Sequence, residues 1–273
     1  MPELPEIETL ARKLRKSIKG KLVESVSLSG LPLRRPVPAA FAKNIQGRTI
    51  RRIIRRGKYL VLELHPRAYW LIHLGMSGRL LYHPFEFPGT KHTHAVIRFS
   101  DGSELQYRDP RRFGLMDIYE VSSLRLIPEL RTLGREPLGS GFDDSWLKPL
   151  LIGSGREVKS FLLDQNKVAG LGNIYVCEAL FMAGLHPERR CNTLSAEEVS
   201  SLVAAVRRVL SRAVRLRGTS FSDFIDLDGN PGKNQNYLNV FQRNGKACMR
   251  CGNSIQRIRQ GNRSTFFCAD CQK

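Results

Sequence analysis

The sequence has 273 residues, with 44 Lys and Arg against 25 Asp and Glu, so its formal net charge is +19. This length predicts about two domains with a sizeable core. The positive excess favours nucleic acid over a membrane surface as the partner, because no segment forms a basic amphipathic helix of the membrane-binding kind. Without an 18-residue apolar run or a signal-peptide region, we expect a cytoplasmic protein with no membrane contact.

The first six residues, Met-Pro-Glu-Leu-Pro-Glu, bring an amine close to carboxylates. The small second residue predicts removal of Met1, which leaves the secondary amine of Pro2 at the N-terminus. Such an amine titrates near pH 8 and is therefore partly nucleophilic at about neutral pH. Its attack on an aldehyde-like carbon gives an iminium, and Glu3 is the natural general acid and base beside it. The alternative is an exposed, frayed terminus in which the prolines only precede a helix.

The first 130 residues read as one helix followed by short strands. An apolar stripe predicts the helix over residues 7–18. Strands alternating with turns are predicted at 22–28, 48–54, 59–64, 69–74, 79–82, 95–99, 104–107 and 115–121. Short strands joined by hairpin turns indicate a β-sandwich or barrel-like half.

Two loops of this half carry candidate functional side chains. In His-Leu-Gly-Met-Ser-Gly, two glycines flank Met76, whose unbranched thioether suits a wedge into a base stack. In Asp-Pro-Arg-Arg-Phe-Gly, Arg111 and Arg112 stand before Phe113, and such a group can fill a void in a duplex and pair with an unpaired base. The alternatives are a core methionine and a charged turn with its phenylalanine folded inward.

Helical patterns dominate from about residue 131. Apolar faces predict helices around 158–165 and 174–185, and a capping box precedes a third helix that ends by Gly218. Between the first two helices, a Gly-Leu-Gly turn leads into Asn173. Backbone N–H groups at such a helix start receive a phosphate well, and an ordinary tight turn is the alternative. Residues 218–233 form either a loop over a pocket or a linker.

Four cysteines near the end have the spacing of a metal site. Sixteen residues separate the pair Cys248 and Cys251 from the pair Cys268 and Cys271, which matches a four-thiolate zinc site. Four thiolates leave no open position, so the expected cofactor is one structural Zn²⁺ per chain. Disulfides are the alternative. The surrounding residues are basic, and a zinc-stabilised β-hairpin of this charge suits phosphates.

In this order the motifs resemble those of the bacterial formamidopyrimidine-DNA glycosylases. The shared set is Pro-Glu-Leu-Pro-Glu, Arg-Gly-Lys-Tyr-Leu, the two loops above, Gly-Leu-Gly-Asn-Ile-Tyr and the four-cysteine finger, and it covers essentially the whole chain. The resemblance implies an α+β fold. Its parts are an N-terminal β-sandwich domain with an N-terminal helix (1–130), a helix–two-turn–helix domain (131–240) and a C-terminal zinc-finger β-hairpin (241–273).

The resemblance also implies an activity. It predicts a monomer that binds damaged double-stranded DNA, excises oxidised purines, chiefly 8-oxoguanine and formamidopyrimidines, and then cleaves the strand by β,δ-elimination. By the same likeness Pro2 is the nucleophile, Glu3 moves the proton, and Lys58 is catalytic and binds phosphate.

Further site residues follow from the resemblance alone. The duplex wedge consists of Met76, Arg111 and Phe113. The residues expected to bind DNA are His92, Arg111, Lys159, Asn173 and Arg263. The other active-site residues are Glu6, Glu178 and Thr219, and residues 219–228 correspond to a lesion-capping loop.

The chain departs from the family pattern at two positions. Arg135 stands where the family usually has Pro, and Phe241 stands where Tyr is common, which removes any role for a hydroxyl there. One rival function is an endonuclease VIII-like glycosylase for oxidised pyrimidines, a group that typically has Gly in place of Leu4 and lacks this wedge. Another is a non-catalytic protein that binds damaged DNA, against which Lys58 and the N-terminal motif argue.

Overall fold

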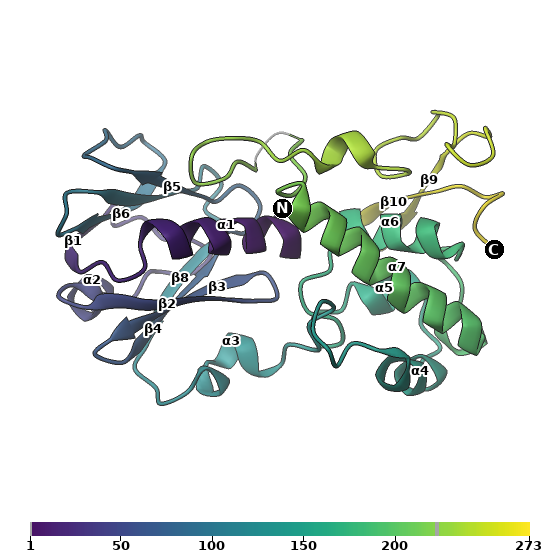
Figure 1. Cartoon of the computed structure of the whole chain (residues 1–273), viewed down its shortest axis with the longest axis horizontal. Helices are drawn as coiled ribbons and strands as arrows, with labels where there is room; N and C mark the ends of the chain where they lie inside the picture. The colour runs from purple at the N-terminus through teal and green to yellow at the C-terminus, as the bar shows by residue number, and fades with distance from the viewer. Residues whose placement is uncertain (1, 222–223) are drawn as a thin grey trace. The chain divides into compact units, whose positions relative to one another are not determined.

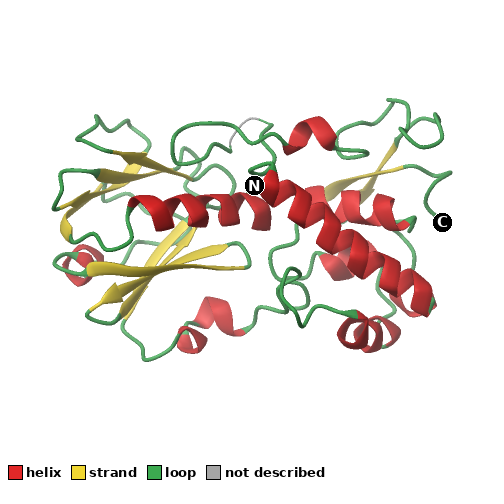
Figure 2. Ribbon diagram, in the orientation of Figure 1, coloured by secondary structure: helices red, strands yellow, loops and turns green. Residues whose placement is uncertain are grey.

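The computed structural model describes residues 2–221 and 224–273. The chain divides into two compact units, Met1–Arg131 with Leu216–Gln235, and Thr132–Arg215 with Asn236–Lys273. Strands gather in the first unit and helices in the second (Figure 2). Residues 216–235 are expected from the sequence in the helical domain, whereas their contacts belong to the first unit. In the described residues no helix is both long and apolar enough to cross a membrane.

Two four-stranded antiparallel sheets form the body of the first unit. One has the order β1-β6-β7-β5, with strands β1 (Val23–Leu28), β6 (Thr93–Phe99), β7 (Glu104–Arg108) and β5 (Arg79–His83). The other has the order β2-β3-β4-β8, with strands β2 (Thr49–Arg56), β3 (Tyr59–His65), β4 (Ala68–His73) and β8 (Leu115–Tyr119). The predicted sandwich is therefore confirmed.

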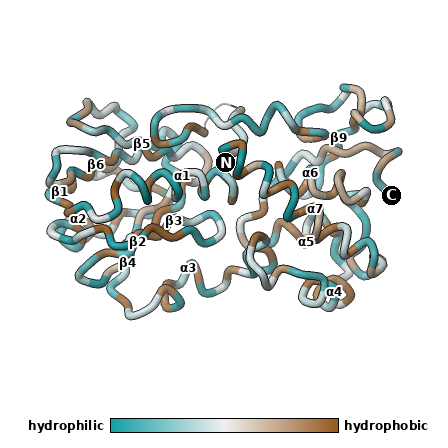
Figure 3. Tube along the Cα trace, in the orientation of Figure 1, coloured by the Kyte–Doolittle hydropathy of each residue, from teal (hydrophilic) through white to brown (hydrophobic). Residues whose placement is uncertain are grey.

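Helix α1 (Leu4–Ser17) runs between the two sheets (Figure 1). Its apolar stripe, with Ile7, Leu10 and Leu14, is buried in one cluster with Trp70 of β4 and Ile97 of β6. Hydrophobic and hydrophilic stretches follow one another along the trace of this helix (Figure 3), as expected when one face is buried and the other is solvated. The buried stripe fixes the helix, and with it the N-terminal residues, against the sandwich.

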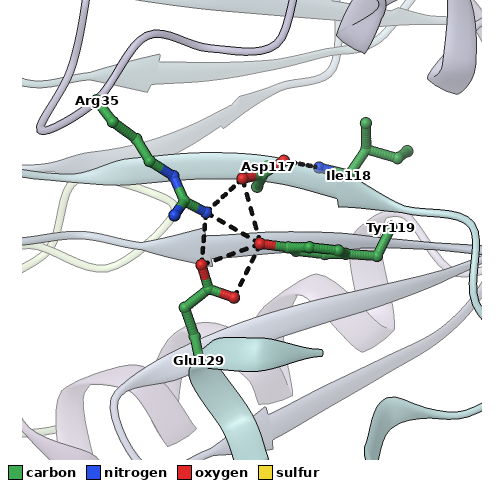
Figure 4. Close-up of polar contacts among 5 residues, drawn as sticks. All are labelled: Arg35, Asp117, Ile118, Tyr119 and Glu129. Carbon is green, nitrogen blue, oxygen red and sulfur yellow. Dashed lines mark hydrogen bonds and ion pairs between the residues drawn. The ribbon is translucent and has the colours of Figure 1, made fainter. Parts of the chain in front are cut away.

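A polar network ties the Pro-rich loop after β1 to the second sheet (Figure 4). The Arg35 guanidinium donates to Asp117 of β8, to the Tyr119 hydroxyl at 3.0 Å and to Glu129. The Tyr119 hydroxyl in turn donates to Glu129 at 2.8 Å. Glu129 belongs to α3 (Pro128–Arg131), a short helix that the sequence did not predict, as it did not predict α2 (Phe41–Ile45) and the 3₁₀ turn η1 (Leu124–Leu126).

The second unit contains most of the remaining helices and the terminal hairpin. Its elements are α4 (Asp144–Ile152), α5 (Val158–Leu162), α6 (Asn173–Ala183), η2 (Cys191–Thr193), α7 (Ala196–Arg215), β9 (Gln256–Gln260) and β10 (Arg263–Phe267), with η3 (Asn234–Tyr237) where the chain enters it for the second time. The predicted capping box opens α7, because the Ser195 N–H donates to Glu198 at 2.8 Å and the Glu198 N–H donates to the Ser195 hydroxyl at 3.2 Å. The helix expected over 158–165 ends at Leu162.

Candidate active site and zinc centre

The start of α1 collects the N-terminal candidates in one buried place. Pro2 is buried, and Glu3 and Glu6 are 3% and 1% exposed. The Glu6 carboxylate accepts the Glu3 N–H at 2.7 Å and the Thr219 N–H at 2.7 Å. Glu6 therefore holds the N-terminal backbone against the segment 216–235. The packing there is tight, since a Cβ added at Gly218, whose φ is +84°, would lie 2.7 Å from a Glu6 carboxylate oxygen.

Lys58 lies at the tip of the β2–β3 hairpin and is 8% exposed. The charge of Lys58 affects the pKa of His73, the last residue of β4. Burial, together with the charges of Arg34 and Lys58, lowers the pKa of His73 to about 3. The imidazole is therefore neutral, and its Nδ1 accepts the Gly75 N–H at 3.0 Å. His73 is not among the site residues expected from the sequence, although it is the first residue of the motif that contains Met76.

The wedge side chains stand out from the first unit. Met76 is 40% exposed and Phe113 is 43% exposed, so neither belongs to the core. Arg111 is exposed, and its guanidinium carbon lies 4.6 Å from the centroid of the Phe113 ring. The backbones of the two loops touch, because a Cβ added at Gly75 would lie 2.4 Å from the carbonyl of Phe113. Met76 thus lies in a loop packed against the loop of Arg111 and Phe113, and the three exposed side chains form one group on the surface.

Asp109 is the buried centre of this group. It is fully buried and accepts the Ser77 hydroxyl at 2.5 Å, the Gly114 N–H at 2.8 Å and the Arg111 N–H at 3.3 Å. Ser77 belongs to the methionine loop and Gly114 to the phenylalanine loop, so one carboxylate joins both. Sequence reasoning missed this residue, and its only signal was its place at the head of the Asp-Pro-Arg-Arg-Phe-Gly motif.

Two further residues support the phenylalanine loop from outside. The Arg34 guanidinium donates to the Phe113 carbonyl at 3.1 Å, and its neighbour Arg35 is fixed by the network of Figure 4. The carbonyl of His92, which is half-buried, accepts the Asp109 N–H at 3.0 Å. His92 therefore lies beside the wedge loops. The sequence alone did not predict this contact.

The second unit brings Asn173 and Arg263 to neighbouring elements. Asn173 is the first residue of α6, and its side-chain amide donates to the Ser264 carbonyl in β10 at 2.8 Å. Arg263 is exposed at the start of the same strand. The hairpin also surrounds a recess of about 410 Å³ whose lining includes Arg257, Arg259 and Arg263. This basic, solvent-facing surface has the chemistry of a phosphate site.

Lys159 and Glu178 lie inside the second unit rather than on its surface. Lys159 is 1% exposed, its ammonium donates to the Thr265 hydroxyl at 2.5 Å, and burial lowers its pKa. Glu178 is fully buried and accepts the backbone N–H groups of Asn239 and Phe241. The Lys159 ammonium therefore lies below the surface of this unit, and Glu178 holds the backbone of the chain that leads into the finger.

The four terminal cysteines form a compact cluster. Their sulfurs all lie within 4.8 Å of one another, with Cys248 to Cys271 at 3.8 Å and Cys251 to Cys268 at 3.5 Å. A tetrahedral ion with Zn–S bonds of about 2.3 Å separates its ligand sulfurs by about 3.8 Å. A disulfide would need about 2.05 Å, so the distances fit zinc and not the disulfide alternative.

Comparison with known proteins assigns the family. Residues 1–116 match the formamidopyrimidine-DNA glycosylase N-terminal domain, 133–225 the H2TH domain of that enzyme, and 245–273 the zinc finger found in FPG and IleRS. The formamidopyrimidine-DNA glycosylase of Ruegeria pomeroyi is 41% identical over 286 residues, which cover all of both chains. The chain belongs to the formamidopyrimidine-DNA glycosylase family. It is thus a member of a family of base-excision DNA glycosylases.

Other members of the family agree in sequence and fold. The enzyme of Desulforamulus reducens is 41% identical over 275 residues, covering 100% of this chain and 99% of the relative. The MutM (FPG) crystal structure from Thermus thermophilus has a TM-score of 0.89 and 38% identity, with 99% and 98% of the two chains covered. A Lactococcus lactis FPG mutant bound to DNA containing Fapy-dG has a TM-score of 0.91 and 35% identity over both whole chains.

The family match confirms two predictions. The α+β fold, with a sandwich, an H2TH part and a terminal finger, is that of the solved structures. The zinc-finger match and the clustered thiols together confirm one structural zinc ion per chain. The expected removal of Met1, and residues 222 and 223 of the expected capping loop, lie outside the described residues.

The role of Asp109 can be tested by stability. Asp109→Asn keeps the shape but turns an amide toward the buried donors of Ser77 and Gly114. We expect it to lower the free energy of unfolding by about 2–4 kcal/mol in urea titrations, because buried donors lose their acceptor. Asp101→Asn, in an exposed hairpin turn of the same unit, is the matched control and should cost about 1 kcal/mol or less. Equal stability of the two variants would refute the central role of Asp109.

Proposed function

We propose that this chain is a bifunctional DNA glycosylase and AP lyase that excises oxidised purines, chiefly 8-oxoguanine and formamidopyrimidines, from double-stranded DNA. The observation that carries the proposal is the buried start of α1, where Pro2 is followed by Glu3 and by Glu6, whose carboxylate accepts two backbone N–H groups. The proposal is supported by relatives whose crystal structures contain DNA with Fapy-dG or with an abasic site.

The chemistry uses Pro2 as the nucleophile once Met1 is removed. The lesion nucleotide leaves the stack, because the sugar of a stacked base cannot be reached. The amine of Pro2 attacks C1′, the bond from C1′ to the base breaks, and the base departs. Glu3 donates a proton to the sugar ring oxygen, which opens the ring and yields an iminium. The iminium acidifies the C2′ proton, so β-elimination and then δ-elimination expel the two flanking phosphates.

The other side chains serve binding. Met76, Arg111 and Phe113 fill the gap that the flipped nucleotide leaves, which offsets the lost stacking. The phosphates around the lesion are bound by Lys58, His92, Asn173 and Arg263. Because Lys159 and Glu178 are buried, we expect them to hold the hairpin and the chain that leads to it rather than to contact DNA directly. A monomeric, cytoplasmic enzyme remains a prediction.

The rival function is excision of oxidised pyrimidines. Two features favour purines over oxidised pyrimidines as the substrates. One is Leu4, where endonuclease VIII-like enzymes typically have Gly, and the other is the exposed wedge with Met76 and Phe113. The test is single-turnover excision from matched duplexes that contain 8-oxoguanine, a formamidopyrimidine, an oxidised pyrimidine or undamaged guanine. We expect excision of the first two with a one-nucleotide gap as product. Preferential release of the oxidised pyrimidine would contradict the proposal, and binding without any release would favour the non-catalytic rival.

A further inference from the structure

Within the segment 216–235, the described stretches 216–221 and 224–235 each contact one face of α1. In the first, the Thr219 N–H donates to Glu6 at 2.7 Å. In the second, the Lys13 ammonium lies 2.7 Å from a carboxylate oxygen of Asp226. Glu6 and Lys13 are seven residues apart, so they project from the same face of α1, about two turns or 10 Å from each other. Thr219 and Asp226 therefore hold their parts of the segment against α1, the helix that follows Pro2.

The second contact is an ion cluster around a buried carboxylate. The Asp226 side chain is 1% exposed, and Lys13 also pairs with Asp228, which is 59% exposed. The other Asp226 oxygen accepts the N–H groups of Asp228 at 3.1 Å and Asn230 at 3.0 Å. One carboxylate thus shapes the turn of the segment and faces the helix at the same time. Arg217 is more distant, at 4.0 Å.

The ammonium of Lys13 stays charged in this setting. Burial by itself disfavours the charged form, but the hydrogen bonds to Asp226 and Asp228 outweigh it and raise the pKa of Lys13. Breaking such a pair leaves a buried charge without compensation, which is far more costly than losing a surface pair. Apolar contacts accompany the pair, because Phe224 and Leu227 are buried in the core of the first unit and the Tyr82 N–H donates to the Leu227 carbonyl at 3.1 Å.

We infer that Lys13 is a positioning residue for recognition of the damaged base, acting through its ion pair with Asp226. The pair holds the segment so that Thr219 remains at Glu6, beside Pro2 and Glu3. The family resemblance makes residues 219–228 the lesion-capping loop, so we expect release of the base to depend on the position of this loop. Cleavage at an abasic site has no base to cap. This inference rests on the proposed function, and it adds a specificity role to a residue outside the catalytic motifs.

The test compares two substrates with one variant. Lys13→Met keeps the length of the stem and a strong helix former but removes the charge. Because small misplacements of binding groups cost up to about 100-fold, we expect single-turnover excision of 8-oxoguanine to fall about tenfold. Cleavage at a preformed abasic site, which has no base to position, should stay within about twofold of wild type. Lys13→Arg should restore most of the excision rate.

Two controls make the result specific. Lys16→Met removes an exposed charge from the same helix and should leave both rates at wild-type levels. Asp226→Asn combined with Lys13→Met should be little slower than Lys13→Met alone, because the two residues act as one pair. Unchanged excision in Lys13→Met, or an equal loss on both substrates, would overturn the inference. A wild-type protein that cleaves abasic DNA but releases no oxidised purine would instead overturn the proposed function.

Discussion

Replacing Glu3 by Gln is expected to slow the excision of 8-oxoguanine by about 10²–10⁴-fold, the usual contribution of a positioned general acid and base. Glu3 is 3% exposed and caps α1, and Gln keeps its size while losing the proton that the sugar oxygen needs. Duplex affinity should survive, because the proposed phosphate contacts come from other residues. Single-turnover rates and fluorescence anisotropy on the same duplex measure the two quantities.

Glu8→Gln is the matched control for this variant. Burial would raise the pKa of Glu8, but hydrogen bonds from Arg12 and Arg55 outweigh it and lower the pKa. Glu8 is therefore an ionised glutamate of the same helix, and its ion-pair partners among the described residues are Arg12, Arg15 and Arg55. Its replacement should change the excision rate by less than about tenfold, as expected for a lost salt-bridge network. Equal losses in the two variants would mean that Glu3 acts through packing and not through proton transfer.

Removal of zinc should have the second largest effect. Without the ion the hairpin loses the cross-link between its two cysteine pairs, and a small apolar cluster that includes Phe266 and Ile255 remains. Arg263 and the basic recess around it then lose their fixed position. Because each phosphate contact adds a salt-dependent share of affinity, we expect duplex binding to weaken by about 100-fold. The helices should remain folded by circular dichroism.

Cys268→Ser, which deletes one ligand, should reproduce the loss of binding. Cys191→Ala is the control, because Cys191 is a buried thiol outside the cluster and should bind DNA like wild type. Zinc content is read by atomic absorption on the same samples. Full DNA affinity in protein with much less than one zinc per chain would contradict the structural role of the ion.

Local signals in the sequence were sufficient for much of the fold. Strand alternation and turn residues predicted the strands of the sandwich, a capping box predicted α7, and cysteine spacing predicted the zinc ion. The short helices α2, α3 and η1 were not predicted, because three to five residues are too few to show a helical period of apolar residues. Helix α4 was not predicted either, and it contains Pro149, a residue type that usually breaks a helix.

Contacts between distant residues could not be predicted in the same way. Asp109 matters because Ser77, 32 residues away, donates to it, and no pattern in the sequence announces that pair. The segment 216–235 joins the first unit through Glu6, 213 residues from Thr219. The family resemblance alone made Lys159 an expected DNA-binding residue, but in the structure its ammonium is buried beside the Thr265 hydroxyl.

The central claim is that the amine of Pro2 forms the covalent intermediate. Borohydride reduction during reaction with a duplex that contains 8-oxoguanine should trap one protein–DNA adduct, and peptide mass spectrometry should map it to the N-terminal peptide that begins at Pro2. The competing amine is Lys58, which is 8% exposed at the tip of its hairpin. An adduct on Pro2, in protein that lacks Met1, is the result that the account predicts. An adduct on Lys58, or an active protein that retains Met1, would contradict it.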